Sequence, residues 1–238
     1  NSSAASDVYK RQLQALLLAG AVGSTGHVTG LDISPEFLSH AEDIVKKSGL
    51  SEQISFQEGD VRELPFDNGT LEWVWSSSCV GYSASLEPLS VVKELARVVK
   101  PGGSVAIFAW SSEKLLPGYP VLEARLNATS SGIAPFVKGK RPELHFLRAL
   151  GWLRDAGLEQ PTARTFAGGA YAPMSDNLRN ALIALFEMRW PSVESELTGE
   201  DWSEYQRLCL PESPEFIIDH PDYYAFFTCS MFCGKVAK

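Results

Sequence analysis

The 238-residue sequence predicts an α/β fold built on a doubly wound, parallel sheet. Short apolar runs alternate with amphipathic segments between residues 27 and 110, and this alternation is typical of βαβ units. The run at 71–75 is apolar apart from Glu72, as in a strand that is covered on both faces. Hydrophobic residues make up 45% and charged residues 21%, so the chain can bury an ordinary globular core.

The first half of the chain shows clear helix and strand boundaries. Ser34 is the expected N-cap of a helix, Pro35 takes its first position, and Gly49 ends it. Pro101, followed by two glycines, is expected to stop a second helix and turn the chain into a buried strand. The expected elements are a helix at 13–21, a strand at 27–31, a helix at 35–48, strands at 54–57 and 71–75, a helix at 89–99 and a strand at 104–110.

The second half follows a different pattern. Residues 111–141 look irregular, and the later elements are a helix at 142–157, a strand at 162–167, helices at 177–190 and 202–210, and a strand at 223–236. We interpret residues 13–170 as an α/β core, 171–222 as an inserted helical cap and 223–238 as the final strand of the core.

Charge and cysteine content exclude several classes of function. The net charge of −8 argues against a general nucleic-acid or membrane-surface binder, because a polyanion would be repelled. No apolar run approaches the roughly 20 residues that span a bilayer. The four cysteines form no CxxC pair and have no histidine at zinc-ligand spacing, so we expect no metal site and reduced thiols in a cytoplasmic protein.

Three segments carry the chemistry. The segment HVTGLDISPEFL (27–38) places an acid at a strand tip, where a carboxylate can accept hydrogen bonds from both ribose hydroxyls of a nucleoside. The others are EGDVRELPFDNGTLEWVWSSS (58–78) and LSVVKELARVVKPGGSVAIFAW (89–110). In this order and at this spacing, they resemble the class I S-adenosylmethionine (SAM) dependent methyltransferases, especially the ubiquinone/menaquinone-type and other small-molecule members.

The resemblance implies a Rossmann-like sheet, SAM as cofactor and a small, apolar or aromatic methyl acceptor. It also implies roles for single residues. Asp32 would bind the ribose and Ile33 would pack on the adenine face. Asp60 would meet the adenine amino group, the backbone N–H of Val61 a ring nitrogen, and Ser76 the methionine part of the cofactor.

No firm catalytic residue follows from the sequence, since a nucleophilic acceptor needs no general base. Tyr82 follows the strand expected at 71–75. In relatives a histidine often lies there, near the acceptor, and the alternative for Tyr82 is an aromatic side chain that only packs in the core. His145 on the expected helix at 142–157 is a weaker candidate, because a lone helical histidine is usually structural. Six aromatic residues are candidates for an apolar pocket or for core packing: Trp110, Tyr119, Phe136, Tyr171, Phe186 and Trp190.

One family feature is missing. The glycine-rich loop after the first strand, which passes close to the methionine part of SAM, does not occur in the sequence. Residues 2–12 read SSAASDVYKRQ, the in-frame translation of a transposon-end adapter used for sequencing libraries, so we interpret residues 1–12 as an artefact. We therefore expect a fragment that lacks the central strand, is unstable and binds SAM poorly.

Two other functions stay open. A nicotinamide-dependent Rossmann oxidoreductase shares the acid at the strand tip, although the KPGG and GDxxxLPF segments speak against it. A non-catalytic methyltransferase-like interaction domain is the second alternative, and the retained Asp32 and Asp60 count weakly against it. The sequence does not determine the acceptor, the methylated atom or the oligomeric state.

Overall fold

The computed structural model describes residues 14–82, 87–133 and 141–238. Residues 14–22 are helical. The labelled helices are α2 (Pro35–Lys47), α3 (Pro88–Val98), α4 (Pro120–Asn127), α5 (Ala149–Asp155), α6 (Asp176–Arg189) and α7 (Gly199–Cys209), with 3₁₀ turns η1 (Pro142–Leu144), η2 (Phe146–Arg148), η3 (Glu194–Glu196) and η4 (Ile217–Asp219). The strands are β1 (Val28–Asp32), β2 (Ile54–Glu58), β3 (Leu71–Ser77), β4 (Val99–Lys114), β5 (Glu159–Tyr171) and β6 (Tyr224–Lys235).

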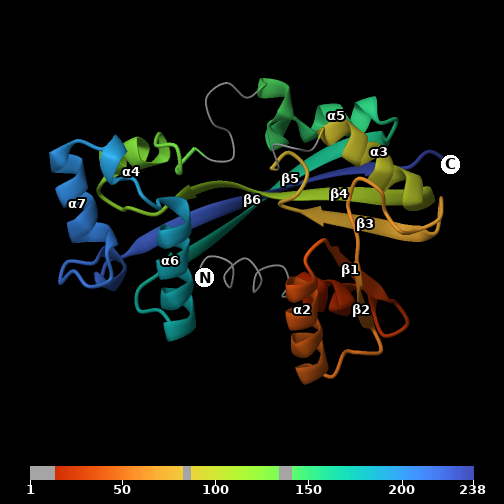
Figure 1. Ribbon diagram of the computed structural model, residues 1–238, viewed down its shortest axis with the longest axis horizontal. Coiled ribbons are helices and arrows are strands. Elements are labelled where there is room, and N and C mark those ends of the chain that lie inside the picture. The colour runs from red at the N-terminus through yellow and green to blue at the C-terminus, as the bar shows by residue number, and fades with distance from the viewer. Residues whose placement is uncertain (1–13, 83–86, 134–140) are drawn as a thin grey trace.

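The described strands form two sheets (Figure 1). β1 and β2 pair in parallel, and the larger sheet has the order β3-β4-β6-β5. In it β3 and β4 are parallel, whereas β6 runs antiparallel to both β4 and β5. The predicted α/β fold with a Rossmann-like arrangement is confirmed, whereas β6 departs from the parallel arrangement that we expected of the sheet.

Long strands give the larger sheet two apolar cores. At one end, α3 and α5 cover the sheet, and Val92, Leu95 and Leu153 lie in this core. At the other end, β4, β5 and β6 reach α4, α6 and α7, which surround Leu126 and Phe186 (Figure 1). The two ends of one sheet therefore support separate helical layers.

Helix α4 lies in the segment that we expected to be irregular, so that expectation is wrong there. Pro120 begins the helix, and Leu122 and Leu126 are buried against α6 and α7 in the second core. A helix of 8 residues is marginal by itself and depends on such packing. The expected cap at 171–222 contains α6 and α7, and α4 packs with them from outside that range.

The KPGG segment does more than stop a helix. Helix α3 ends at Val98 and β4 begins at Val99, five residues earlier than expected. Gly102 has φ +81°, a conformation that favours glycine. A Cβ on Gly103 would lie 2.6 Å from the carbonyl oxygen of Glu72 on β3, so the strands approach closely only because this residue is glycine.

Two further expectations are corrected. The helix expected at 142–157 is two 3₁₀ turns followed by α5, and His145 lies in extended backbone between the turns. The proline at the start leaves only a short turn, and the stable helix begins at Ala149. β3 is not covered on both faces, because Trp73 is 37% exposed. The helix at 14–22 contacts the strand through Gln14, which donates to Ser77 and accepts from the indole N–H of Trp75.

Candidate functional site

The two acidic residues of the first two motifs lie at the same edge of the β1–β2 pair. Asp32 is the last residue of β1 and pairs with Glu58, the last residue of β2. The N–H of Gly59 donates to the carbonyl of Asp32 at 3.0 Å, and Asp60 follows directly. Ligands of open α/β sheets bind at the carboxyl ends of parallel strands, and the structure brings both residues there.

The turn after β1 is ordered by short-range hydrogen bonds. A carboxylate oxygen of Asp32 accepts from the N–H of Ser34 at 3.0 Å. Ser34 is the N-cap of α2 and accepts from the N–H of Phe37 at 3.4 Å, so the predicted cap is confirmed. Ile33, between them, is 69% exposed, which leaves a large apolar side chain beside the strand tip.

Asp60 has a close partner within its own loop. Its carboxylate accepts from the N–H of Arg62 at 2.8 Å and from Arg62 Nε at 2.9 and 3.0 Å. These hydrogen bonds, above all those from the Arg62 side chain, lower the pKa of Asp60 to about 2. Asp60 is therefore an ionised acceptor at neutral pH. Val61, the next residue, packs partly buried against the core under α3.

The loop after Asp60 is bound by two side chains of α3. The N–H of Leu64 donates to Glu94 Oε1 at 2.7 Å, and Arg97 donates to the carbonyls of Leu64 at 3.0 Å and Phe66 at 2.9 Å. Sequence reasoning missed this link, although the ExxR spacing in the third motif was visible. A cavity of about 540 Å³ borders this loop and both α3 side chains, and neither Asp32 nor Asp60 lines it.

Ser76 lies near the carboxyl end of β3 and is buried. Its hydroxyl oxygen has no hydrogen-bond partner within the described residues. An unpaired buried hydroxyl costs free energy, so a ligand that reaches this strand end would gain a ready partner.

The two candidate catalytic residues both stack on Phe146. Tyr82 stacks on Phe146 with ring centroids 5.1 Å apart, and its hydroxyl donates to the carbonyl of Trp110 at 2.7 Å. Burial raises the pKa of Tyr82 well above its ordinary value. His145 also stacks on Phe146, accepts from the N–H of Leu147 at 3.2 Å, and has its pKa lowered by burial. These contacts give both side chains packing roles.

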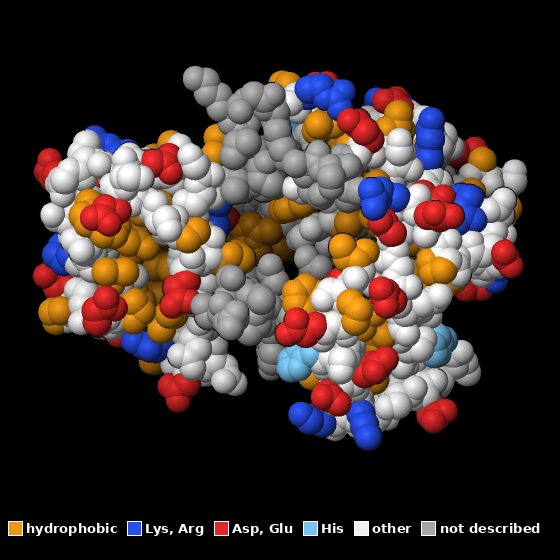
Figure 2. Space-filling view, in the orientation of Figure 1, with side chains coloured by type: hydrophobic (Ala, Val, Ile, Leu, Met, Phe, Trp, Pro, Cys, Tyr) orange, Lys and Arg blue, Asp and Glu red, His pale blue; other side chains and the backbone are white. Residues whose placement is uncertain are grey.

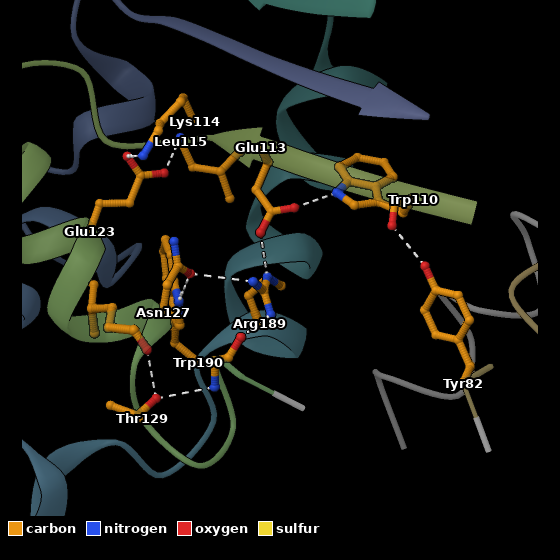
Figure 3. A network of polar contacts seen from close by, with 12 residues as sticks. Tyr82, Trp110, Glu113, Lys114, Leu115, Glu123, Asn127, Thr129, Arg189 and Trp190 are labelled. Atoms are coloured by element: carbon orange, nitrogen blue, oxygen red, sulfur yellow. Dashed lines mark hydrogen bonds and ion pairs between the residues drawn. The ribbon is translucent and has the colours of Figure 1, made fainter. Parts of the chain in front are cut away.

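A polar network runs from Tyr82 to α4 and α6 (Figure 3). The indole N–H of Trp110 donates to Glu113, and Arg189 Nε donates to the other carboxylate oxygen of Glu113 at 2.6 Å. Trp110 also stacks on Phe227 with centroids 4.8 Å apart. Figure 2 shows the surface hollowed between the part that carries α4, α6 and α7 and the part that carries β1 and β2, with hydrophobic side chains at its floor.

The remaining aromatic residues that were candidates for an apolar pocket differ in their burial. Phe186 and Trp190 are buried and Tyr119 packs on the same core, whereas Tyr171 is exposed. Phe136 lies outside the described residues.

The described residues contain no group of three or more His, Cys, Asp or Glu side chains placed to hold a metal ion. Among the helices of the described ranges, none is long and apolar enough to cross a bilayer. The four cysteines are free thiols.

The sequence is similar to known methyltransferases. Residues 13–103 match the methyltransferase domain family. A demethylmenaquinone methyltransferase of Bacillus pumilus is 34% identical over 170 residues, which are 66% of this chain and 70% of that protein. The enzyme of the same name from Bacillus subtilis is 40% identical over 102 residues, 42% of each chain. A sterol 24-C-methyltransferase of Gibberella zeae is 28% identical over 69% of this chain and 45% of its own.

Solved structures show the same fold. The YcgJ protein of Bacillus subtilis superposes with a TM-score of 0.50 at 13% identity and covers 94% of this chain and 98% of its own. The complex between the Haloferax volcanii Trm112 methyltransferase activator and a methyltransferase has a TM-score of 0.50 at 19% identity, over 95% of this chain and 78% of that chain.

Proposed function

Because the chain belongs to the class I SAM-dependent methyltransferases, we propose that Asp32 and Asp60 bind the adenosine part of its cofactor, S-adenosylmethionine. The position of both carboxylates at one edge of the β1–β2 pair is the observation that supports this site. Asp32 accepts from the ribose hydroxyls, and Asp60 accepts from the adenine amino group. The backbone N–H of Val61 donates to a ring nitrogen.

The chemistry of the remaining residues fits the cofactor. Exposed Ile33 offers an apolar surface for one face of the adenine, and the Ser76 hydroxyl offers a partner for the methionine part. SAM supplies a methyl group activated on a sulfonium, so the reaction itself belongs to the cofactor. The protein orients the acceptor and excludes water, and we assign no general base.

We further propose that the complete domain has a parallel strand between β1 and β3. In the described part of the chain, β1 pairs only with β2 and β3 only with β4, so both facing edges present unpaired backbone groups. The family places its glycine-bearing first strand at this position. Without such a strand, only the contacts to the adenosine part of SAM remain, and we expect SAM to bind weakly.

The acceptor is a small, apolar molecule in this proposal. Two of the similar proteins are named as methyltransferases of demethylmenaquinone and of a sterol, and both acceptors are largely apolar. The stacked Trp110 and Phe227, next to Tyr82, are partly buried aromatic side chains that offer stacking surface for such an acceptor. A net charge of −8 disfavours a nucleic-acid acceptor, and four free thiols are typical of the cytoplasm, where we place the activity.

Ligand-dependent stabilisation tests the cofactor site. We expect millimolar S-adenosylhomocysteine to raise the melting temperature and NADH to leave it unchanged. Asp32→Asn keeps an oxygen for the Ser34 N–H but removes the charge, and should abolish the effect; Asp43→Asn, an exposed acid on α2, is the matched control. Stabilisation by NADH, or an unchanged response of Asp32→Asn, would contradict the proposal. If calorimetry showed that this chain binds SAM with a micromolar dissociation constant, the proposal that a strand between β1 and β3 is needed for tight binding would be contradicted.

A further inference from the structure

We propose that Glu94 and Arg97, three residues apart on α3, are positioning residues that present the adenine-binding loop (residues 60–68) to the cofactor. The inference rests on the proposed role of Asp60 and Val61. Neither α3 side chain is placed at the strand tips themselves, so their effect passes through the loop backbone.

Leu64 is the point at which the loop is held. Its N–H donates to Glu94 Oε1 at 2.7 Å, and its carbonyl accepts from Arg97 Nη2 at 3.0 Å. Its side chain is buried in the core beneath α3. Both backbone polar groups and the side chain of one residue are therefore bound from the same helix, which leaves this part of the loop little freedom.

Arg97 extends the contact along the loop. Its Nη1 donates to the carbonyl of Phe66 at 2.9 Å and to the side-chain oxygen of Asn68 at 2.7 Å. The guanidinium is kept in place by two hydrogen bonds of 2.8 Å to the two oxygens of Glu94. Only the planar fork of arginine can bind a carboxylate in this way and still reach several carbonyls, so lysine is not equivalent.

The fixed Leu64 determines where Asp60 lies. The N–H of Glu63 donates to the carbonyl of Asp60 at 3.0 Å and closes a turn over residues 60–63, which Leu64 follows directly. Val61, inside this turn, packs on the same core as Leu64. Release of Leu64 would therefore let the turn move relative to β1 and separate Asp60 and Val61 from Asp32.

The test uses conservative variants and two measurements. Arg97→Lys keeps the charge and removes the fork, and Arg179→Lys removes a comparable two-bond contact, with Asp219, far from the loop. S-adenosylhomocysteine affinity is measured by NMR titration, which reaches millimolar constants, and hydrogen exchange reports the amides of residues 60–68. We expect Arg97→Lys to lower affinity about tenfold and to speed exchange in this loop alone, and Arg179→Lys to change neither.

A second pair of variants separates positioning from general stability. Glu94→Gln keeps an oxygen for the Leu64 N–H and should lose less affinity than Glu94→Leu, which has none. If the unaltered chain binds and Arg97→Lys binds equally well despite faster loop exchange, the positioning role is overturned while the proposed function stands. If the unaltered chain does not bind S-adenosylhomocysteine at all, both proposals fail.

Discussion

Arg189, the last residue of α6, donates a hydrogen bond at 2.6 Å to Glu113 on β4, although 76 residues separate them in the chain. The side chains are 21% and 5% exposed, respectively. Glu113 also accepts from the indole of Trp110, and Arg189 donates to the carbonyl of Gly132 at 2.6 Å (Figure 3). This ion pair therefore joins α6 to β4 beside the aromatic side chains of the proposed acceptor surface.

Removal of Arg189 should be strongly destabilising. Arg189→Met leaves Glu113 buried without its charge partner, and we expect the free energy of unfolding to fall by about 3 kcal/mol. Arg179→Met, on the same helix, breaks a more exposed pair with Asp219 and should cost less than about 1 kcal/mol. Urea denaturation measures the free energy of unfolding of both variants. Equal losses in Arg189→Met and Arg179→Met would show that the burial of the Arg189–Glu113 pair adds nothing to its contribution.

The two glycines of the KPGG segment should respond differently to alanine. Gly103→Ala places a Cβ 2.6 Å from the Glu72 carbonyl, so the free energy of unfolding should fall by about 3 kcal/mol. At Gly102 the nearest atoms to a new Cβ belong to the Lys238 side chain at 3.6 Å, and only the φ of +81° opposes alanine, at about 1 kcal/mol. Thermal and urea unfolding would reveal the order, and a larger loss at Gly102 would refute this packing argument.

The Glu94–Arg97 pair should add a pH dependence to stability. The hydrogen bond from Arg97 is the main cause that lowers the pKa of Glu94 below its ordinary value of 4.5. Because the folded pKa is the lower one, the pair stabilises the fold above about pH 4.5, and this contribution is lost as the pH falls through the folded pKa. Glu94→Gln should therefore flatten the stability profile below about pH 4.5, measured by urea unfolding across that range. An unchanged slope would mean that the pair is not formed in solution.

Tyr82→Phe should affect stability more than catalysis. The variant loses the hydrogen bond to the Trp110 carbonyl, worth about 1 kcal/mol, while the stacking on Phe146 remains. Since burial raises the pKa of Tyr82, the neutral phenol is a poor base near pH 7. In the proposed methyl transfer to a small apolar acceptor, kcat should stay within about threefold. A hundredfold loss of kcat at unchanged stability would instead make Tyr82 a catalytic residue.

Local signals in the sequence determined the element order and several boundaries. Ser34 was recognisable as a cap because its role depends on the N–H groups of the next turn alone, and the acids at the strand tips follow from where β1 and β2 end. The KPGG segment likewise indicated a change from helix to strand, although β4 already begins at Val99, before both glycines. Each of these features depends on neighbours within a few residues.

Only the tertiary structure decided the rest. Helix α4 exists because α6 and α7 bury its leucines. His145 lies in extended backbone before a 3₁₀ turn in which Phe146 is buried. The partners of Glu113 and of Leu64 are 76 and 30 residues away in the chain. The residue pattern of a single segment cannot specify these contacts. They form only when the whole sheet has placed the helices and strands relative to one another.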